Sequence, residues 1–318
     1  MDSKKVVFLF CLLVMPICGF SKKNVSFVFH NTRQGTMLCE NDHPVFFYQK
    51  ERKTIDGKFY FNNYLHPLFS LGGDTLTEEF PADHPYHRGI YWAWHQIYVD
   101  NESIGDGWVM EDISQEVTDM KTKVNGNGAN LDLNVLWKSS LFKDGKPFVQ
   151  EHTTIFVHPL ENERRVIDFE IELKALVTGV SIGGSNDEKG YGGFCLRIKN
   201  PKQLTFTSER GLVKSEINPI KSGPWMDISI PNRAGDIDGI TILCHSSTPN
   251  YPATWILRNY EASMQNIVYP GKDRVELSMN KPTILRYRLI IHKGSSKYLD
   301  MVGLQSAYEK TIIKNLEH

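Results

Sequence analysis

The chain has 318 residues, of which 41% are hydrophobic and 11% aromatic, enough apolar material to form a substantial core. Its 36 basic and 37 acidic residues give a formal net charge of -1. Such a balance provides no electrostatic attraction to nucleic acid or to an anionic membrane surface, and we exclude both as partners.

The first 21 residues have the pattern of a cleavable secretory signal peptide. Lys4 and Lys5 precede an apolar run over residues 6–17, and small residues follow at 19–21. The run is about a dozen residues, too short to cross a bilayer core of about 30 Å, and no later stretch reaches the roughly 18 apolar residues that a membrane span needs. We therefore expect a periplasmic or secreted protein without a membrane span, with lipidation at Cys18 as the less favoured alternative.

Three cysteines follow the predicted signal peptide, at Cys39, Cys195 and Cys244. Their odd number and wide spacing argue against a disulfide framework. No CxxC pair occurs, so the sequence gives no support for a structural zinc site. We expect these residues to be buried thiols.

Alternation of apolar and polar residues dominates the remaining chain. Residues 131–137 and 167–175 alternate with the period of two that is typical of a strand with one exposed face. Similar runs lie near residues 25–30, 45–49, 58–64, 117–124, 150–158, 203–207, 237–244 and 284–292. Asp144-Gly145, between two such runs, predicts a hairpin.

The C-terminal residues follow a different period. Met301, Leu304, Tyr308 and Ile312 recur at helical spacing and predict an amphipathic helix over about 298–315. Together these patterns predict an all-β protein: one large β-sandwich domain, residues 22–318, of supersandwich-like architecture with a C-terminal α-helix.

Residues 64–95 carry the densest set of chemically active side chains. Four of the eleven histidines lie here, at His66, His84, His87 and His95. Prolines at 67, 81 and 85 restrict the backbone, and rigid loops on a β scaffold are common places for functional sites. We predict the working surface in this stretch.

Three later segments could converge on the same surface: residues 191–197, His245 at the end of an apolar strand, and the cationic stripe of Arg286, Arg288 and His292. A solvated or ion-paired edge explains the stripe as well as a site does. The candidate catalytic residues are His84, His87, His66 and Tyr191, and the candidate substrate-binding residues are Asp83, Arg88, Trp94, Arg197 and His245.

Several short motifs resemble the family of bacterial proteins labelled PmoA. They are Leu65-His66-Pro67-Leu68, Phe80-Pro81-Ala82-Asp83-His84-Pro85, His87-Arg88-Gly89, Gly192-Gly193-Phe194 with Leu196-Arg197, and the later residues Trp225, Asp227, Gly239, His245, Pro252, Trp255 and Arg258. The resemblance covers roughly residues 55–295. The label itself is misleading, because a membrane methane oxygenase subunit would need transmembrane helices that this sequence does not predict.

The resemblance implies a secreted β-sandwich protein encoded beside polysaccharide-processing enzymes. The residues it carries over are His66, Asp83, His84, His87, Arg88, Arg197 and His245. Tyr86 stands where relatives often have a histidine, which argues against a metal site that uses this position. Glu261 replaces a glycine of the family pattern, so we expect the substrate to differ from that of the family's commonest member.

We predict an enzyme that acts on acidic, uronate-containing oligosaccharides by β-elimination, as a lyase or dehydratase. Removal of a proton next to a sugar carboxylate requires a base, an acid and a cation that stabilises the developing negative charge. Histidine would act as the base and arginine would hold the carboxylate. No organic cofactor is required.

Three alternatives remain open. A glycoside hydrolase could use a carboxylate pair from Glu78, Glu79, Asp83 and Glu111. A non-catalytic sugar-binding protein could use Trp92, Trp94 and Trp108 as stacking platforms, although core packing explains the first two equally well. A divalent metal could bind the histidine cluster of His66, His84, His87 and His95.

Overall fold

The computed structural model describes residues 25–199, 201–232, 234–260 and 263–311. The predicted signal peptide lies outside this part of the chain, so a periplasmic or secreted location stays a prediction, as does the domain boundary at residue 22. Among the described residues no helix is long and apolar enough to cross a membrane.

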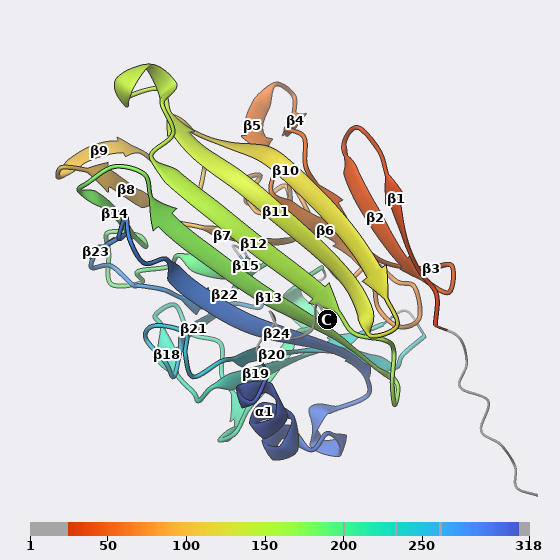
Figure 1. Ribbon diagram of the computed structural model, residues 1–318. Helices are drawn as coiled ribbons and strands as arrows, with labels where there is room; N and C mark the ends of the chain where they lie inside the picture. Colours follow the sequence, from red (N-terminus) through yellow and green to blue (C-terminus); the bar gives the residue numbers. More distant parts are fainter. Residues whose placement is uncertain (1–24, 200, 233, 261–262, 312–318) are drawn as a thin grey trace, which may run out of the picture.

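Two nine-stranded antiparallel sheets form the molecule (Figure 1). The first sheet has the order β1 (Phe27–Asn31), β2 (Gly35–Glu40), β3 (His43–Gln49), β6 (Tyr64–Leu68), β7 (Ile90–Ala93), β15 (Gly193–Leu196), β22 (Gln265–Val268), β21 (Thr254–Leu257) and β18 (Ile220–Lys221). The second has the order β10 (Ile113–Asn125), β11 (Gly128–Ser139), β12 (Val149–Val157), β13 (Arg164–Ala175), β24 (Thr283–Lys293), β20 (Ile237–Cys244), β19 (Trp225–Pro231), β16 (Thr205–Ser208) and β17 (Gly211–Val213).

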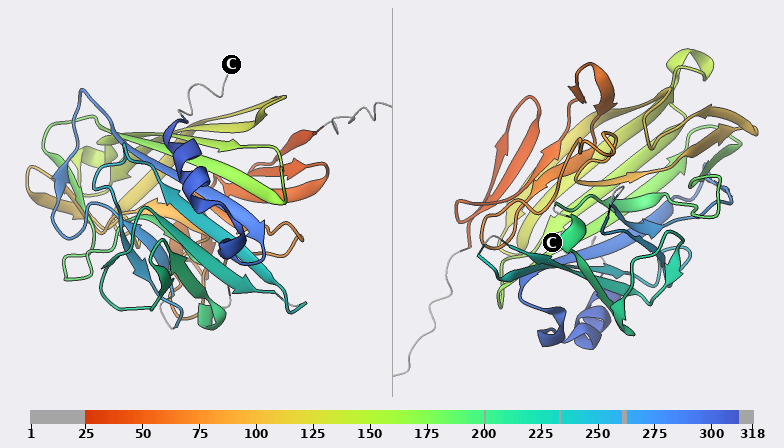
Figure 2. Two further views of the ribbon diagram at one scale, coloured as in Figure 1. Left: turned by 90° about the horizontal axis from the view of Figure 1, so that it is seen from below. Right: turned by 180° about the vertical axis from the view of Figure 1, so that it is seen from behind.

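Two smaller sheets extend this frame. One has the order β23 (Val275–Glu276), β14 (Val180–Gly183), β8 (Gln96–Val99) and β9 (Glu102–Gly105), and the other pairs β4 (Lys53–Ile55) with β5 (Lys58–Phe61). Short 3-10 turns occupy Lys143–Gly145, Pro201–Gln203 and Ser296–Tyr298. The views in Figure 2 show the large sheets layered against each other.

The main core lies between the two large sheets because alternate side chains of each strand point inward. On β13, Ile167, Phe169 and Ile171 are fully buried in this core, and Trp92 and Phe194 enter it from the first sheet. The alternation read from the sequence therefore corresponds to real strands.

The opposite face of the first sheet carries a second, smaller apolar cluster. Tyr64, Tyr91 and Cys195 point to this side and pack with Trp108 and Ile256. The histidine-rich stretch lies on this outer layer, outside the main core.

The predicted hairpin and helix are both present. Asp144 and Gly145 adopt positive φ angles of 55° and 77° in the turn that joins β11 to β12. Helix α1 (Met301–Glu309) is shorter than the expected 298–315: Asp300 caps its first turn by accepting a hydrogen bond from the Gly303 backbone N–H at 2.9 Å. Residues 312–318 lie outside the described part.

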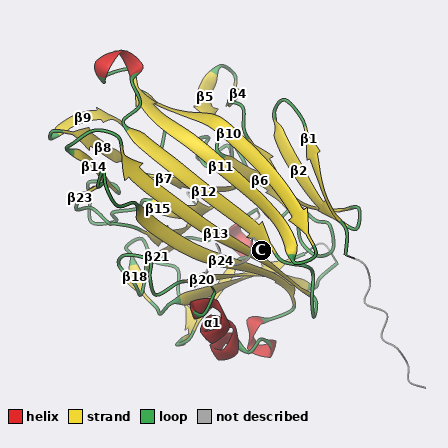
Figure 3. Ribbon diagram, viewed as in Figure 1, coloured by secondary structure: helices red, strands yellow, loops and turns green. Residues whose placement is uncertain are grey.

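Figure 3 shows the strand-rich body with this one α-helix near its C-terminal end. Helix α1 packs Met301 and Tyr308 against Leu243 and Ile290 on the outer face of the second sheet. The prediction of a large β-sandwich with a C-terminal helix is confirmed. Cys195 and Cys244 are buried free thiols, and Cys39 is a partly exposed one.

Candidate functional site

Residues 80–89 form a stiff loop on the outer face of the first sheet. The backbone N–H of His84 donates to the Pro81 carbonyl at 3.1 Å, and that of His87 donates to the His84 carbonyl at 2.9 Å. Phe80 closes the loop by donating to the His87 carbonyl at 3.0 Å. These successive turns fix the direction of each side chain in the loop.

Arg197 anchors this loop from the neighbouring strand β15. Its guanidinium donates to both carboxylate oxygens of Asp83, at 2.8 and 3.2 Å, and to Glu78 at 3.1 Å. A further bond at 2.8 Å reaches the Ser263 carbonyl, and only 3% of the side chain is exposed. Since protein carboxylates already occupy the guanidinium, Arg197 positions Asp83 and does not bind substrate directly, which corrects its predicted role.

Asp83 in turn contacts His84. The imidazole Nδ1 lies 3.3 Å from the Asp83 carboxylate, and 27% of the His84 side chain is exposed. A carboxylate at Nδ1 favours the tautomer with its proton there and leaves Nε2 as the basic nitrogen. His84 is therefore an oriented imidazole that is open to solvent, whereas Asp83, predicted to bind substrate, contacts His84 and Arg197 instead.

His87 lies beneath His84 and is almost fully buried. The two rings stack with centroids 5.2 Å apart, and only 2% of His87 is exposed. Burial, reinforced by the positive charge of Arg197, holds the pKa of His87 well below its usual value. His87 stays neutral and supports His84 from below, so it is a positioning residue.

Arg88 does not reach the surface. Its guanidinium lies between the rings of Phe61 and Tyr91, 4.2 and 4.4 Å from their centroids, and donates to the Tyr86 and Trp108 carbonyls. Burial lowers its pKa to about 10. With 2% exposure it cannot meet a substrate carboxylate, and the prediction that it binds substrate is wrong.

Trp94 is also placed away from any substrate. It is fully buried, donates from Nε1 to the Tyr269 carbonyl at 2.8 Å, and packs against Trp137 in the main core. Trp92 and Trp108 are 2% and 0% exposed. The predicted substrate contact of Trp94 is therefore wrong, and none of the three tryptophans offers an open stacking platform.

His245 lies on the far side of the sandwich. It follows β20 of the second sheet, and its ring contacts Tyr308 and the Glu309 carboxylate of helix α1. The outer faces of the two sheets point in opposite directions, so His245 does not join the histidine-rich loop. The expectation of convergence is wrong for this residue.

His66 occupies a neighbouring cluster on β6. Its Nδ1 lies 3.0 Å from the Thr77 hydroxyl, and its Nε2 lies 3.7 Å from the Glu79 carboxylate. Glu79 also accepts hydrogen bonds from Tyr64, at 2.7 Å, and from Lys53. Burial lowers the pKa of His66 despite the opposing effect of Glu79.

A second histidine–carboxylate pair lies farther along the same outer face. His95 Nδ1 is 2.7 Å from the Asp106 carboxylate, and its ring stacks on Trp108 and meets the edge of Tyr191. The sequence predicts a role for His95 only as a metal ligand and does not single out Asp106. A histidine directly after two tryptophans and an Asp-Gly turn eleven residues later were the available signals.

Arg258 is a further group that the sequence analysis did not assign to the site. Its guanidinium lies 5.8 Å from the centroid of the Tyr191 ring, and its charge opposes the rise in pKa of both Tyr86 and Tyr191. It is 9% exposed and donates from Nη2 to the Ile217 carbonyl at 3.3 Å, and no described carboxylate lies within ion-pair distance of it. We call the set of His84, Tyr86, His95, Tyr191 and Arg258 the outer polar cluster.

Unpaired polar atoms gather at this cluster. His95 Nε2, Trp108 Nε1 and Arg258 Nε are buried and have no hydrogen-bond partner within the described part of the chain. Buried polar atoms are normally paired, and each unpaired one costs about 1–3 kcal/mol. Several such atoms in one neighbourhood are typical of a site that completes its hydrogen bonds with a polar ligand.

The histidines are not arranged as a metal site. His84 and His87 stack face to face, and no group of three or more His, Cys, Asp or Glu side chains in the described ranges could hold a metal ion. Three carboxylates considered for glycoside hydrolysis are engaged in other contacts. Glu78 and Asp83 form ion pairs with Arg197, and Glu79 pairs with Lys53 and accepts a hydrogen bond from Tyr64.

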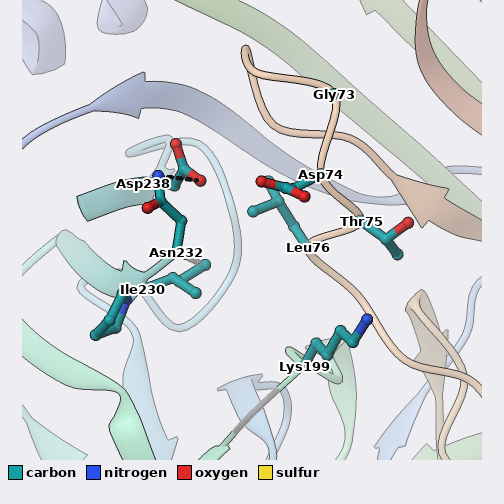
Figure 4. A pocket seen from close by; sticks show the side chains of 9 residues that line it. Gly73, Asp74, Thr75, Leu76, Lys199, Ile230, Asn232 and Asp238 are labelled. Carbon is teal, nitrogen blue, oxygen red and sulfur yellow. Dashed lines mark hydrogen bonds between the residues drawn. The ribbon is translucent and has the colours of Figure 1, made fainter. Parts of the chain in front are cut away.

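A separate cavity of about 250 Å³ lies between the loop that precedes Thr77 and the end of the second sheet. Figure 4 shows Asp74 and Leu76 facing Ile230, Asn232 and Asp238 across it. None of the sequence-predicted site residues lines this cavity. Burial and the nearby Asp74 raise the pKa of Asp238, whose carboxylate accepts a hydrogen bond from Asn232 at 3.5 Å.

Residues 36–304 match the model of a family described as a family of unknown function, DUF6807. The chain belongs to this family. No curated protein matches the chain. The resemblance to PmoA-labelled proteins stays a prediction.

Two solved structures show a distant likeness to this chain. A candidate mutarotase, YeaD, from Salmonella typhimurium aligns with a TM-score of 0.35 and 10% identity over 86% of this chain and 92% of that one. Heparinase III aligns with a TM-score of 0.32 and 9% identity over 86% of this chain, which spans 36% of heparinase III. At these scores neither likeness carries an argument about activity.

Proposed function

We propose that this DUF6807 member is a carbohydrate-active enzyme that cleaves acidic, uronate-containing oligosaccharides by β-elimination at the outer polar cluster. One observation carries the proposal: His84, oriented by Asp83 and open to solvent, lies on the same face as Arg258, a guanidinium without a carboxylate partner among the described residues. A base and a cation that can pair with the substrate carboxylate are the two groups that proton removal beside a carboxylate needs.

Arg258 takes the part first assigned to Arg88. Its guanidinium would hold the uronate carboxylate and stabilise the negative charge that develops when the adjacent carbon loses its proton. Arg88 and Arg197 cannot do so, because the first is buried between two rings and the second is paired with Asp83 and Glu78.

His84 Nε2 would accept the proton on the carbon next to the carboxylate. The electrons of that C–H bond form the new carbon–carbon double bond, and the neighbouring C–O bond breaks. The leaving oxygen receives a proton from the Tyr191 phenol. Burial, together with Tyr86 and Asp187, raises the pKa of Tyr191, so the phenol keeps its proton at neutral pH and can act as the acid.

No observation favours the hydrolase or the binding-module alternative. Hydrolysis by paired carboxylates needs two carboxyl groups facing the glycosidic bond, whereas Glu78, Glu79 and Asp83 are held in ion pairs. The tryptophans considered for sugar stacking are buried.

The test is an incubation of the protein with plant and algal uronate oligosaccharides. Elimination produces a conjugated unsaturated uronate, seen as rising ultraviolet absorbance. New reducing ends without that absorbance would mean hydrolysis, and binding without either product would mean a non-catalytic protein.

Substitutions locate the activity. His84→Ala should lower kcat by about 10²–10⁴-fold, the usual contribution of a general base. His43→Ala, at an exposed histidine on β3, is the matched control and should leave kcat unchanged. An active His84→Ala variant with kcat within about threefold of the parent would refute the assignment of the base.

A further inference from the structure

A cavity of about 650 Å³ lies on the four-stranded sheet, beside the outer polar cluster. Its walls include Gln96 and Tyr98 of β8, Asp100, Asn186, Arg274 and Glu276. The volume falls within the range of small-molecule sites, roughly 300–1,000 Å³.

The cavity and the outer polar cluster share two segments of chain. Gln96 lines the cavity and directly follows His95, and consecutive Cα atoms are about 3.8 Å apart. Asn186 lines the cavity from the loop that ends in Tyr191, and the Ser185 backbone N–H donates to the Tyr191 carbonyl at 2.9 Å. One oligosaccharide can therefore contact both places.

Gln96 connects the segments that separate the cavity from the outer polar cluster. Its side-chain amide donates to the Gly184 carbonyl at 2.9 Å and to the Lys272 carbonyl at 2.7 Å. A Cβ at Gly183 would lie 2.8 Å from Gln96 Nε2 and 2.9 Å from Arg274 Cγ. Glycine at this position is what allows both side chains to lie flat along the sheet.

The cavity contains a planar platform. The Arg274 guanidinium carbon lies 3.8 Å from the centroid of the Tyr98 ring, a close cation–π contact. In the described ranges no carboxylate forms an ion pair with Arg274. A flat, polar-edged surface of this kind can pack against the face of a sugar ring and donate to its hydroxyl groups.

The charges in the cavity differ from those of the outer polar cluster. Asp100, Asp273 and Glu276 outnumber Lys272 and Arg274. Lys272 is moreover paired with Glu188, which does not line the cavity, at 3.0 Å. A uronate carboxylate would be repelled here, whereas the hydroxyl groups of an uncharged sugar can donate to carboxylates and amides.

We infer that this cavity binds a neutral sugar residue joined to the acidic residue at the outer polar cluster. The substrate would then be an oligosaccharide that contains both uronate and neutral sugars, not a polymer of uronate alone. This inference rests on the proposed function for the placement of the acidic sugar.

Calorimetric binding to the His84→Gln variant tests it without turnover. The probes are tetrasaccharides of hyaluronan and of glucuronoxylan, which mix uronate with neutral sugars, the monosaccharide glucuronic acid, which lacks the neutral sugar, and tetragalacturonate. We expect at least one mixed tetrasaccharide to bind about tenfold or more tightly than glucuronic acid and than tetragalacturonate.

Removal of the platform should abolish that gain. Arg274→Ala and Tyr98→Ala, each added to His84→Gln, should weaken binding of the mixed tetrasaccharide about tenfold and leave binding of glucuronic acid unchanged. Arg33→Ala, at an exposed arginine between β1 and β2, is the control. Equal affinity for long and short probes, no binding by any mixed probe, or no effect of Arg274→Ala beyond that of Arg33→Ala would overturn the inference.

The two proposals can fail separately. A platform-dependent gain without unsaturated product from the wild-type protein would disprove elimination and retain the neutral-sugar site. Product formation without a length-dependent gain would retain elimination and disprove the neutral-sugar site.

Discussion

Glu151 is fully buried and His95 is partly buried, and the two ionisable residues differ in how completely their polar atoms are hydrogen-bonded. Glu151 of β12 lies fully buried between the two sheets and accepts hydrogen bonds from Asn63, Trp92, Trp137 and Thr153, all at 2.9–3.0 Å. Burial raises the pKa of Glu151, and the four donors offset only part of that rise. This carboxylate has a complete set of partners.

The outer face of the first sheet is the reverse case. Within the described ranges His95 has one hydrogen-bond partner, Asp106, and its buried Nε2 is unpaired, as is Nε1 of the adjoining Trp108. A saturated polar cluster contributes to fold and rigidity, whereas an unsaturated one retains the capacity to bind. The two residues therefore differ in the capacity left for a ligand: Glu151 has none, whereas His95 Nε2 and Trp108 Nε1 can still form hydrogen bonds.

The largest expected effect is at the saturated carboxylate. Glu151→Gln replaces one accepting oxygen by an N–H₂ group that faces indole donors, and should lower the free energy of unfolding by about 3–5 kcal/mol. Urea denaturation measures the change. Glu102→Gln, at an exposed glutamate, should change stability by no more than about 0.5 kcal/mol. A loss below about 1 kcal/mol at Glu151 would contradict its structural role.

A smaller effect is expected from substitutions at Arg88 and Arg258, which should act on stability and on KM respectively. Arg88→Met removes the contacts with Phe61 and Tyr91 and two hydrogen bonds to carbonyls, and should lower the free energy of unfolding by about 2–4 kcal/mol. Arg258→Lys should leave stability within about 1 kcal/mol and raise KM for the acidic substrate about tenfold, because lysine lacks the bidentate geometry. The reverse pattern, with Arg88 affecting KM and Arg258 stability, would invert the assignment of the cation.

The smallest effect concerns the pH dependence set by His87. Its pKa is well below the usual value in the folded protein and about 6.5 in the unfolded chain. Below pH of about 6.5 the unfolded chain binds a proton that the folded protein refuses, so the free energy of unfolding falls by up to about 1.4 kcal/mol per pH unit until the folded pKa is reached. The contribution is fully present above pH of about 6.5.

His87→Gln should remove that part of the slope. Denaturation at several pH values between about 7.5 and 5.5 measures it in both proteins. His66, whose pKa burial also lowers, keeps its contribution in each. Parallel stability curves for the parent and the variant would show that His87 can take up a proton in the folded state.

Much of the fold could be predicted from local pattern. Period-two alternation identified strands such as β11 and β13, Asp144-Gly145 identified their neighbouring hairpin, and helical spacing identified α1. These features depend on neighbours in sequence, so the chain itself contains the information. Helix length depended on the cap at Asp300, which the spacing alone did not reveal.

The candidate site was only partly predictable. The prolines and turns at 81–89 correctly indicated a rigid loop, and Asp83, His84, Arg197 and Tyr191 do lie on one outer face. Arg88 and Trp94 were assigned to the substrate by composition, and tertiary packing buried both. Residue type states what a side chain can do, while exposure decides whether it can do so.

The sequence by itself determined that apolar and polar residues alternate along the strands and that a stiff, histidine-rich loop joins two of those strands. Only the tertiary structure decided which guanidinium lacks a carboxylate partner among the described residues, because Arg88, Arg197 and Arg258 have the same chemistry and differ in partners. Those partners come from residues up to 119 positions away, such as Glu78 for Arg197. Pairing over such distances is set by the stacking of sheets and strands, not by local sequence.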